Sequence, residues 1–358
     1  MSNDEAGPRS VREVGHSRFL TTVFTVVIIS AALYFARSVL EPIAFMLFVM
    51  ALVGPFQYAA EIRTRKWIAL ILTILMTLFV LSLLVLAIVW SIGEVAHWGL
   101  ANVDKFQSLA VRVKQWLENY DLFVVAFSKV NSASFVGLFQ AIAAQVNYFL
   151  SFVLVVFLFL IFGLAEMTDF KDKLAELDKG MSGWSLLETC GRISEKIRKY
   201  MLIRTIASAV TGVAVFLFTL AIGLDLAIAW GVLSFVLNYI PYIGPLIAVI
   251  LPVIFAMAQF ESWPMAVMIF GSLYLIQLVI GNYLEPMLTG NALAISPLVM
   301  LVAFFIWNFL WGLPGAFIGL PVTIALFTIW EQNPSTRWVA RLMSTSQTVI
   351  GTKASPAN

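Results

Sequence analysis

The chain has 358 residues, of which 61% are hydrophobic and 12% are charged. A soluble domain carries about twice that share of charged residues, roughly 25%. One cysteine and two histidines exclude an internal disulfide framework and argue against a metalloenzyme site or a metal cofactor. The composition therefore favours a membrane protein with the lipid bilayer as its solvent and no nucleic-acid partner, and the net charge of +2 adds nothing.

Apolar runs long enough to cross a bilayer recur along the chain. A membrane helix needs about 20 apolar residues, and about eight such runs appear when Asp225, Glu261 and Glu285 are taken as boundaries in the C-terminal half. The predicted fold class is all-α: a polytopic membrane protein with about eight transmembrane helices, some broken or re-entrant in the C-terminal half, plus an extracytoplasmic amphipathic helical segment. The expected organisation is a cytoplasmic tail (1–18), three transmembrane helices (19–93), the amphipathic segment (94–145), a fourth transmembrane helix (146–165), a cytoplasmic helical segment (166–204), a C-terminal bundle with broken helices (205–330) and a cytoplasmic tail (331–358).

The basic residues predict the orientation, because Lys and Arg concentrate in cytoplasmic loops. They gather before the first run, between the second and third, between the fourth and fifth, and after the last. This pattern places both termini in the cytoplasm. Parity requires only an even number of crossings between Arg204 and Arg337, so a re-entrant loop inside one long run fits as well.

Two segments outside the spans have a helical pattern. Apolar residues recur every three or four positions over Val95–Phe123, which predicts an amphipathic helix. It would pack on its own bundle or on the membrane surface, or else meet the same helix of a neighbouring subunit. The segment 166–204 is expected to form two short helices broken at Lys179–Gly183, and its basic end would anchor the topology at anionic headgroups.

The last two long runs are predicted to break inside the membrane. Leu226–Phe260 would measure about 52 Å as one helix, and Pro286–Trp330 is longer still. Proline removes a backbone donor and clashes with the preceding turn. The residues expected to break the helices or to gate are Pro241, Gly244, Pro245, Pro286, Gly312, Pro314 and Gly315.

Polar residues beside these breaks are the candidates for a solute pathway. Unwound backbone and polar side chains at membrane depth mark binding sites in transporters, although a Pro or Gly kink that only shapes packing would give the same pattern. The candidates are Asn238, Tyr239, Tyr242, Gln277, Asn282, Glu285 and Asn308. Glu285 is the leading one, since it could carry a proton or pair with a cation, unless it is an ordinary loop charge.

These segments resemble a known family. Asn238–Pro245 (NYIPYIGP), Gly281–Gly290 (GNYLEPMLTG) and Ser296–Leu326 look like the C-terminal signature of the autoinducer-2 exporter family, also called PerM-type permeases. Two departures are Asn308, where the family often has Gly, and the added Pro314. The resemblance implies a secondary transporter of the bacterial inner membrane and a homo-oligomer. Some family members are similar to autoinducer-2 exporters, and others behave as cation–proton antiporters.

The predicted function is therefore transport of a small polar solute, with autoinducer-2 as one candidate and H⁺ or Na⁺ as the ions to consider. The alternatives are a monovalent cation/proton antiporter and an uncoupled oligomeric channel. An enzyme is not expected, because every predicted span lacks histidine and no second acid lies near Glu285. No phosphate-binding loop of the Walker type occurs, so no nucleotide is expected as an energy source.

Overall fold

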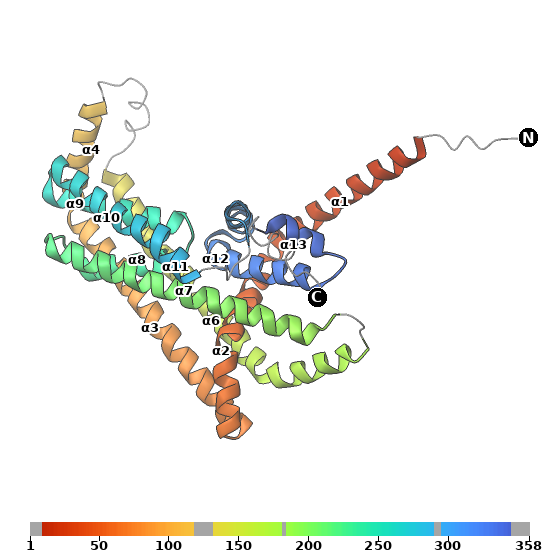
Figure 1. The fold of residues 1–358 in the computed structure, drawn as a ribbon. Coiled ribbons are helices and arrows are strands. Elements are labelled where there is room, and N and C mark those ends of the chain that lie inside the picture. The colour runs from red at the N-terminus through yellow and green to blue at the C-terminus, as the bar shows by residue number, and fades with distance from the viewer. Residues whose placement is uncertain (1–8, 118–131, 181–183, 290–294, 345–358) are drawn as a thin grey trace, which may run out of the picture.

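The structure is a computed structural model that describes residues 9–117, 132–180, 184–289 and 295–344. In these ranges every regular element is a helix, apart from one isolated bridge between Ile295 and Ser344. The all-α prediction is thus confirmed. The elements are α1 (Arg9–Phe35), α2 (Arg37–Arg63), α3 (Lys66–Ala101), α4 (Val103–Leu117), α6 (Ser132–Asp178), α7 (Leu186–Ala221), α8 (Ala227–Leu237), α9 (Ile243–Phe260), α10 (Trp263–Val279), the π-helical turn η1 (Ile280–Leu284), α11 (Glu285–Thr289), α12 (Pro297–Gln332) and α13 (Arg337–Met343) (Figure 1).

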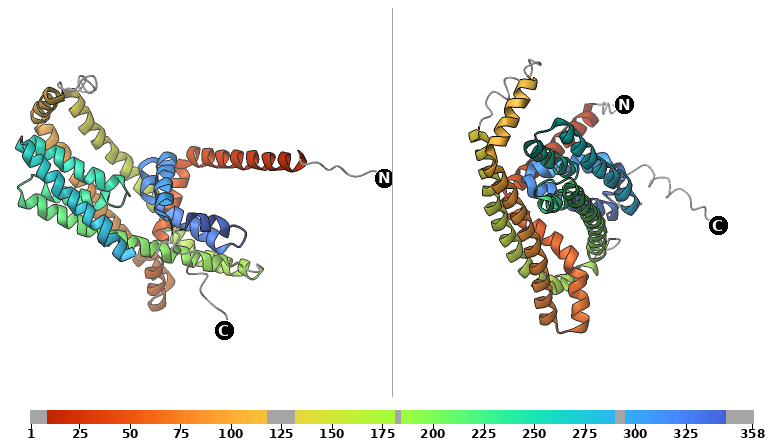
Figure 2. Two further views of the ribbon diagram at one scale, coloured as in Figure 1. Left: turned by 45° about the horizontal axis from the view of Figure 1, so that its top comes forward. Right: turned by 90° about the vertical axis from the view of Figure 1, so that its left-hand side faces the viewer.

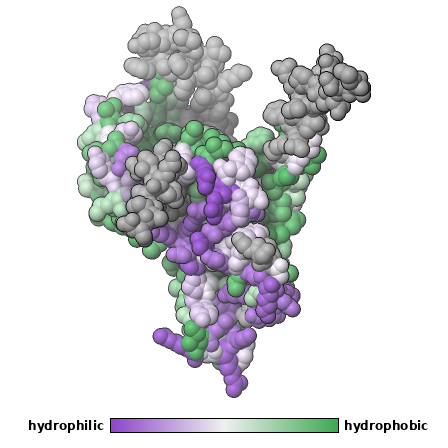
Figure 3. Space-filling view, turned by 45° about the vertical axis from the view of Figure 1, so that its right-hand side comes forward, coloured by the Kyte–Doolittle hydropathy of each residue, from purple (hydrophilic) through white to green (hydrophobic). Residues whose placement is uncertain are grey.

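Seven helical stretches among the described residues are long and apolar enough to cross a membrane. They are Arg37–Arg63, Lys66–Ala101, Tyr148–Met167, Leu186–Ala221, Ile243–Phe260, Trp263–Leu288 and Pro297–Gln332. Large apolar side chains on α3 and α6 point outward: Phe79 is 68% exposed, Leu86 67% and Leu154 70%. Such a continuous apolar surface requires lipid or another protein against it. Figure 3 shows hydrophilic surface gathered below, where the α2–α3 and α6–α7 turns lie, with hydrophobic surface above it.

The segment between the third and fourth predicted spans differs in its boundaries from the expectation. Helix α3 continues to Ala101, and α4 starts anew after Asn102, so the amphipathic pattern is divided between two helices. Helix α6 already begins at Ser132 and continues past the predicted fourth span to Asp178. The remainder of the predicted amphipathic helix, 118–123, lies outside the described residues.

Helix α7 joins two hydrophobic cores. Its first half contributes Ile197 and Tyr200 to a core with α2, α12 and α13. Its second half contributes Val215 to a core with α8, α9, α10 and the end of α3. Figure 1 shows α7 running between these two groups of helices. Figure 2 shows α3 and α6 side by side along one edge of the molecule, while α1 extends away from it.

Helices α8 and α9 form a helical hairpin, here called hairpin A (Ala227–Phe260). Near the end of α9, the Gln259 side chain accepts a hydrogen bond from the Asp225 N–H and donates one to the Gly223 carbonyl, both at 2.9 Å. The end of α9 therefore lies beside the start of α8. The chain reverses over residues 238–242, so the break predicted around Pro241 is a complete turn.

Helix α12 is a second hairpin, here called hairpin B (Pro297–Gln332). Gly312 has non-helical backbone angles, φ 62° and ψ −141°. The Trp307 Nε1–H donates to the Thr323 hydroxyl at 3.1 Å, whereas those residues would be about 24 Å apart along a straight helix. The run predicted to break near Gly312 therefore folds back on itself.

The two hairpins enter from opposite ends of α7. The base of hairpin A lies beside Gly223, just after α7 ends. The base of hairpin B is tied to the first half of α7 by the ion pair of Lys196 with Glu331, at 2.6 Å. A hairpin returns to the side from which it came, so neither hairpin changes the side on which the next segment begins. The even number of crossings expected between Arg204 and Arg337 stays a prediction.

Close backbone contacts at glycine shape both turns. A Cβ at Gly244 would lie 1.8 Å from the Leu237 carbonyl oxygen, and one at Gly315 would lie 2.1 Å from that of Trp307. Neither distance is tolerable, so each position requires glycine. Pro245 and Pro314 lie in the first turn after their reversals, where a missing N–H costs little.

Pro286 does not end its helix. The chain passes from α10 through the π-helical turn η1 into α11, and Pro286 is the second residue of α11. Proline cannot donate to the carbonyl four residues earlier, and a widened turn accommodates that loss without unwinding the helix. The break expected at this position is thus a local change of helical pitch.

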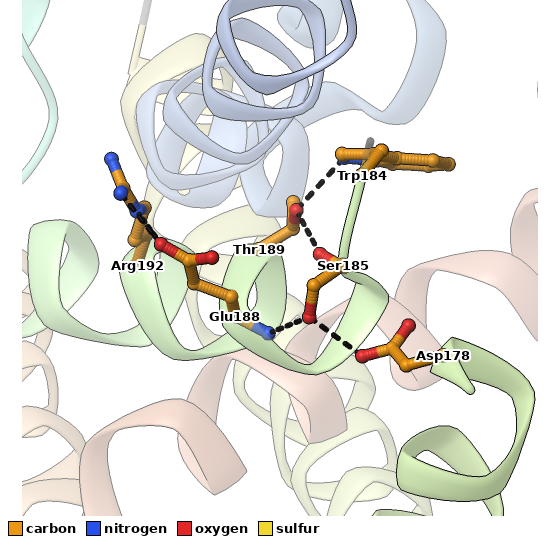
Figure 4. A network of polar contacts seen from close by, with 6 residues as sticks. All are labelled: Asp178, Trp184, Ser185, Glu188, Thr189 and Arg192. Atoms are coloured by element: carbon orange, nitrogen blue, oxygen red, sulfur yellow. Dashed lines mark hydrogen bonds and ion pairs between the residues drawn. The ribbon is translucent and has the colours of Figure 1, made fainter. Parts of the chain in front are cut away.

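A polar network fixes the turn between α6 and α7 (Figure 4). The Asp178 carboxylate accepts hydrogen bonds from the Ser185 hydroxyl at 2.6 Å and from the Leu186 and Leu187 N–H groups at 2.7 and 3.0 Å. The Ser185 hydroxyl in turn accepts from the Glu188 N–H. This arrangement caps the first turn of α7 and sets its direction from α6.

Substitution of Gly312 tests the turn of hairpin B. Its backbone angles belong almost only to glycine, and Gly312→Ala should lower stability by roughly 1–3 kcal/mol. The thermal unfolding midpoint of the purified protein in detergent measures this. Gly271→Ala is the matched control, because an added Cβ there meets no heavy atom within 4 Å. Equal midpoints for the two variants would contradict the hairpin.

Acidification tests the cap of α7. The Ser185 hydroxyl, with further help from the Leu186 and Leu187 N–H groups, holds the pKa of Asp178 below its ordinary value of 3.8. The stabilising effect is therefore complete above that value and is lost as the pH falls through the lower pKa of the folded state. Asp178→Ala should reduce amide-exchange protection of Leu186 and Leu187 at neutral pH and have little further effect in strong acid. Asp172 is exposed, and Asp172→Ala should leave the amide-exchange protection of Leu186 and Leu187 unchanged. An equal loss of protection in the two variants would refute the cap.

Candidate functional site

An ion pair between the helices α7 and α11 forms the centre of the candidate site. Arg204 comes from the middle of α7, and Glu285 is the first residue of α11. Arg204 Nη1 lies 2.5 Å from Glu285 Oε1, and the two side chains are 10% and 25% exposed. Most ion pairs lie at the surface, where they contribute little. The energetic contribution of a pair this enclosed depends on the groups that surround it.

The tip of hairpin A lies against α7 next to this pair. The Tyr239 hydroxyl donates to the Thr205 hydroxyl at 2.9 Å, and Thr205 follows Arg204 in sequence. The fully buried Asn238 side chain donates to the Ser208 hydroxyl at 3.2 Å. These contacts bring the predicted residues Asn238 and Tyr239 to the level of the ion pair.

The same tip also packs against both arms of hairpin B. Ile240 is buried with Phe304 of the first arm and Ala316 of the second. Tyr239 stacks on Phe317 of the second arm, with ring centroids 5.7 Å apart. Hairpin A thus reaches between α7 and hairpin B. The ion pair of α7 and α11 lies beside the tip of hairpin A.

Tyr242 ends the tip in an unusual backbone conformation. Its φ of 62° is rare for a residue with a side chain. The Tyr242 hydroxyl donates to the Pro297 carbonyl at the start of hairpin B, at 3.4 Å, and the side chain is half exposed. Strained residues of this kind cluster at binding sites and switches, so the observation marks Tyr242 as a functional candidate.

The polar groups of the site include donors without acceptors. Among buried side-chain atoms of the described residues, Arg204 Nε and Gln277 Nε2 have no hydrogen-bond partner. Gln277 lies on α10, the helix that leads to Glu285. A buried donor left unpaired costs about 1–3 kcal/mol. The Arg204 Nε therefore offers a hydrogen bond to a molecule that carries an acceptor oxygen.

The structure does not bring every predicted site residue into this cluster. Asn282 is exposed on η1, and Asn308 is exposed on the first arm of hairpin B. Gly312, Pro314 and Gly315 lie at the turn of hairpin B, where Trp311 Nε1–H donates to the Leu33 carbonyl of α1 at 3.1 Å. They act on the shape of the hairpin, and no described contact joins them to the ion pair.

Sequence reasoning missed Arg204, which entered it only as a basic topology marker. Thr205 and Ser208, which accept hydrogen bonds from Tyr239 and Asn238, were also missed, because small hydroxyl residues are common in apolar helices. One signal was present: Arg204 directly precedes the charge-free run 205–224, so it is the last charge before a predicted span. A charge in that position is either an interface anchor or part of a buried site.

No described group of three or more His, Cys, Asp or Glu side chains could hold a metal ion. The described part of the chain thus presents helices of membrane-spanning length, two opposed hairpins and a buried polar site where they meet. Broken helices that meet at a polar site from opposite sides are typical of secondary transporters. The class that the fold and site define is a polytopic membrane transport protein.

Comparison with known proteins agrees with this class. Residues 23–334 match the family model described as "AI-2E family transporter", and the chain belongs to this family. A putative transport protein of Borreliella burgdorferi is 31% identical over 86% of this chain and 85% of its own length. The AI-2 transport protein TqsA of Escherichia coli is 26% identical over 89% of this chain and 93% of its own. A putative transport protein of Haemophilus influenzae is 28% identical over 91% and 96%.

A double-mutant cycle measures how strongly the central pair is coupled. Arg204→Gln or Glu285→Gln alone leaves one enclosed charge without its counter-charge and should lower stability clearly, by less than the about 3–5 kcal/mol of a fully buried pair because Glu285 is 25% exposed. The double variant should recover part of the loss, as judged from thermal midpoints. Additive losses would show that the two side chains do not interact.

Proposed function

We propose that this chain is a secondary transporter that binds a small polar solute beside Arg204 and Glu285 and moves it across the bacterial inner membrane. The observation that supports it most is the enclosed ion pair at the junction of α7, α11 and the tip of hairpin A. Polar groups inside an apolar helical bundle are expensive and mark solute pathways. No catalytic role is proposed for any residue.

Autoinducer-2 is the first solute to test, because the E. coli relative TqsA is named for transport of AI-2. The unpaired Nε of Arg204 suits a solute that carries oxygen acceptors. A cation would instead need acceptor oxygens, and the one carboxylate found at the junction already contacts Arg204. This arrangement favours a polar organic solute over the alternative of a cation/proton antiporter.

The proposed arrangement includes both termini in the cytoplasm and a homo-oligomer, in line with the basic loops and with the apolar faces of α3 and α6. Cysteine accessibility at the two ends of the chain would test the orientation. Mass measurement of the detergent-solubilised protein would test the assembly.

Flux through proteoliposomes tests the proposed function. Wild-type protein should move autoinducer-2 in response to a pH gradient. The variant Arg204→Gln/Glu285→Gln keeps the site neutral and should slow movement by roughly tenfold or more, the effect of losing about 1.4 kcal/mol of interaction. Glu188→Gln, in an exposed pair of α7, is the control.

Three results would contradict parts of this proposal. Internal pH changes that depend on Na⁺ or K⁺ without autoinducer-2 movement would indicate an antiporter. Flux that ignores the pH gradient would indicate an uncoupled channel. Equal flux in the wild type and the double variant would remove the ion pair from the pathway.

A further inference from the structure

The ion pair uses only part of the hydrogen-bonding capacity of Arg204. One guanidinium nitrogen, Nη1, contacts Glu285, while Nε is buried without a partner. A guanidinium presents its donors as a planar fork that matches the two oxygens of a carboxylate. Arg204 can therefore receive a second carboxylate-like ligand along its Nε edge.

Charge balance restricts what that ligand is. A cation as enclosed as Arg204 needs a counter-charge, because an uncompensated buried charge is strongly destabilising. If an anion joined the pair while Glu285 stayed ionised, the site would carry a net negative charge. If Glu285 were neutral and the ligand also neutral, Arg204 would be uncompensated. A neutral ligand beside the intact pair would also keep the charges balanced, but where a ligand takes the place of Glu285 on Arg204, the balanced exchange is an anion on Arg204 together with a proton on Glu285.

We propose that Arg204 binds a small carboxylate-bearing solute and that Glu285 releases Arg204 by taking up one proton, so that one anion and one proton bind together. Without solute, Glu285 is ionised and pairs with Arg204. With solute, the proton from the surrounding water neutralises Glu285, and the carboxylate of the solute replaces it. The proposal rests on the proposed transport of a small polar solute, replaces autoinducer-2 with a carboxylate as the solute of this site, and adds the coupling step.

The surroundings of Glu285 suit this exchange. Tyr200 from α7 and Tyr242 from the tip of hairpin A interact electrostatically with both members of the pair, and Tyr239 interacts with Arg204. Tyrosines ordinarily titrate near pH 10, and Glu285 is the carboxyl group that contacts Arg204. Its side chain is 25% exposed, so the protein does not fully enclose it.

Ligand binding to the purified full-length protein in detergent tests the proposal. The probe is lactate, a small carboxylate that stays ionised in mildly acidic solution, and the readout is the rise of the thermal midpoint with lactate concentration. Chloride at equal ionic strength controls for salt, and glycerol controls for neutral vicinal hydroxyls. Glu285→Gln mimics the protonated carboxyl, and Glu261→Gln is a matched control in the exposed pair with Arg112.

The expected results differ in their pH profiles. Wild type and Glu261→Gln should bind lactate more tightly as the pH falls, by up to about tenfold per pH unit for one linked proton. Glu285→Gln should bind equally well at every pH, with the affinity that the wild type reaches only in acid. Arg204→Gln/Glu285→Gln should not bind. A purely structural ion pair would produce no lactate-dependent shift in Glu285→Gln.

Other outcomes would overturn the proposal. They are the absence of a lactate shift in both wild type and Glu285→Gln, a shift that survives in the double variant, or an equal shift with glycerol or chloride. Autoinducer-2 flux measured on the same preparation separates the two ideas. If flux persists while lactate binding fails, the carboxylate and proton exchange is wrong and the proposed transport function stands.

Discussion

The fold depends on how two chain reversals satisfy their backbone inside an apolar helical bundle. Unpaired N–H and C=O groups are tolerated at membrane depth only where protein shields them. At the tip of hairpin A the N–H groups of Asn238, Tyr239 and Ile240 bond to carbonyls three or four residues earlier, and Pro241 has no N–H to satisfy. After the reversal, the backbone of Gly244 packs directly against the Leu237 carbonyl. The reversal leaves little backbone polarity uncovered.

Small residues on α7 allow the close helix packing that positions the tip of hairpin A. Gly212 and Gly231 approach so closely that a Cβ on either would meet the other's carbonyl within about 3 Å. Membrane helices commonly pack through such small residues, because the backbones then come into contact. Ala207, Ser208 and Thr211 are buried on the same helix. This close packing of α7 with α8 sets Asn238 beside Ser208, and so brings the turn of hairpin A to the ion pair.

Much of the architecture could be predicted from the sequence, and the reasons are physical. Runs of apolar residues and their excessive length showed where helices lie and that two of them break near Pro241 and Gly312. The same pattern could not show that each break is a full reversal. That outcome depends on contacts between arms, such as Trp307 with Thr323, which no local periodicity encodes. The pitch change at η1 was likewise hidden, since Pro286 predicts a break and the π turn absorbs it.

Only part of the candidate site could be predicted from the sequence. Asn238, Tyr239, Gln277 and Glu285 stood out because polar groups in apolar runs are rare. Arg204 did not, because a basic residue at the start of a span is the usual topology signal. Its function as the partner of Glu285 is a tertiary property: two residues 81 positions apart meet because α7 and α11 pack against each other.

The burial of this ion pair distinguishes it from two exposed pairs among the described residues. Arg112 with Glu261 and Arg192 with Glu188 have side chains about half exposed, where water and salt weaken them. Arg204 and Glu285 have lost most of that solvent, and a well-packed apolar pair would often be at least as stable in their place. Stability alone therefore gives no reason to keep two opposite charges at the junction of both hairpins. A site that has to exchange one partner of a charge for another does give such a reason, because only a residue that remains charged can hold first a carboxylate of the protein and then one from solution.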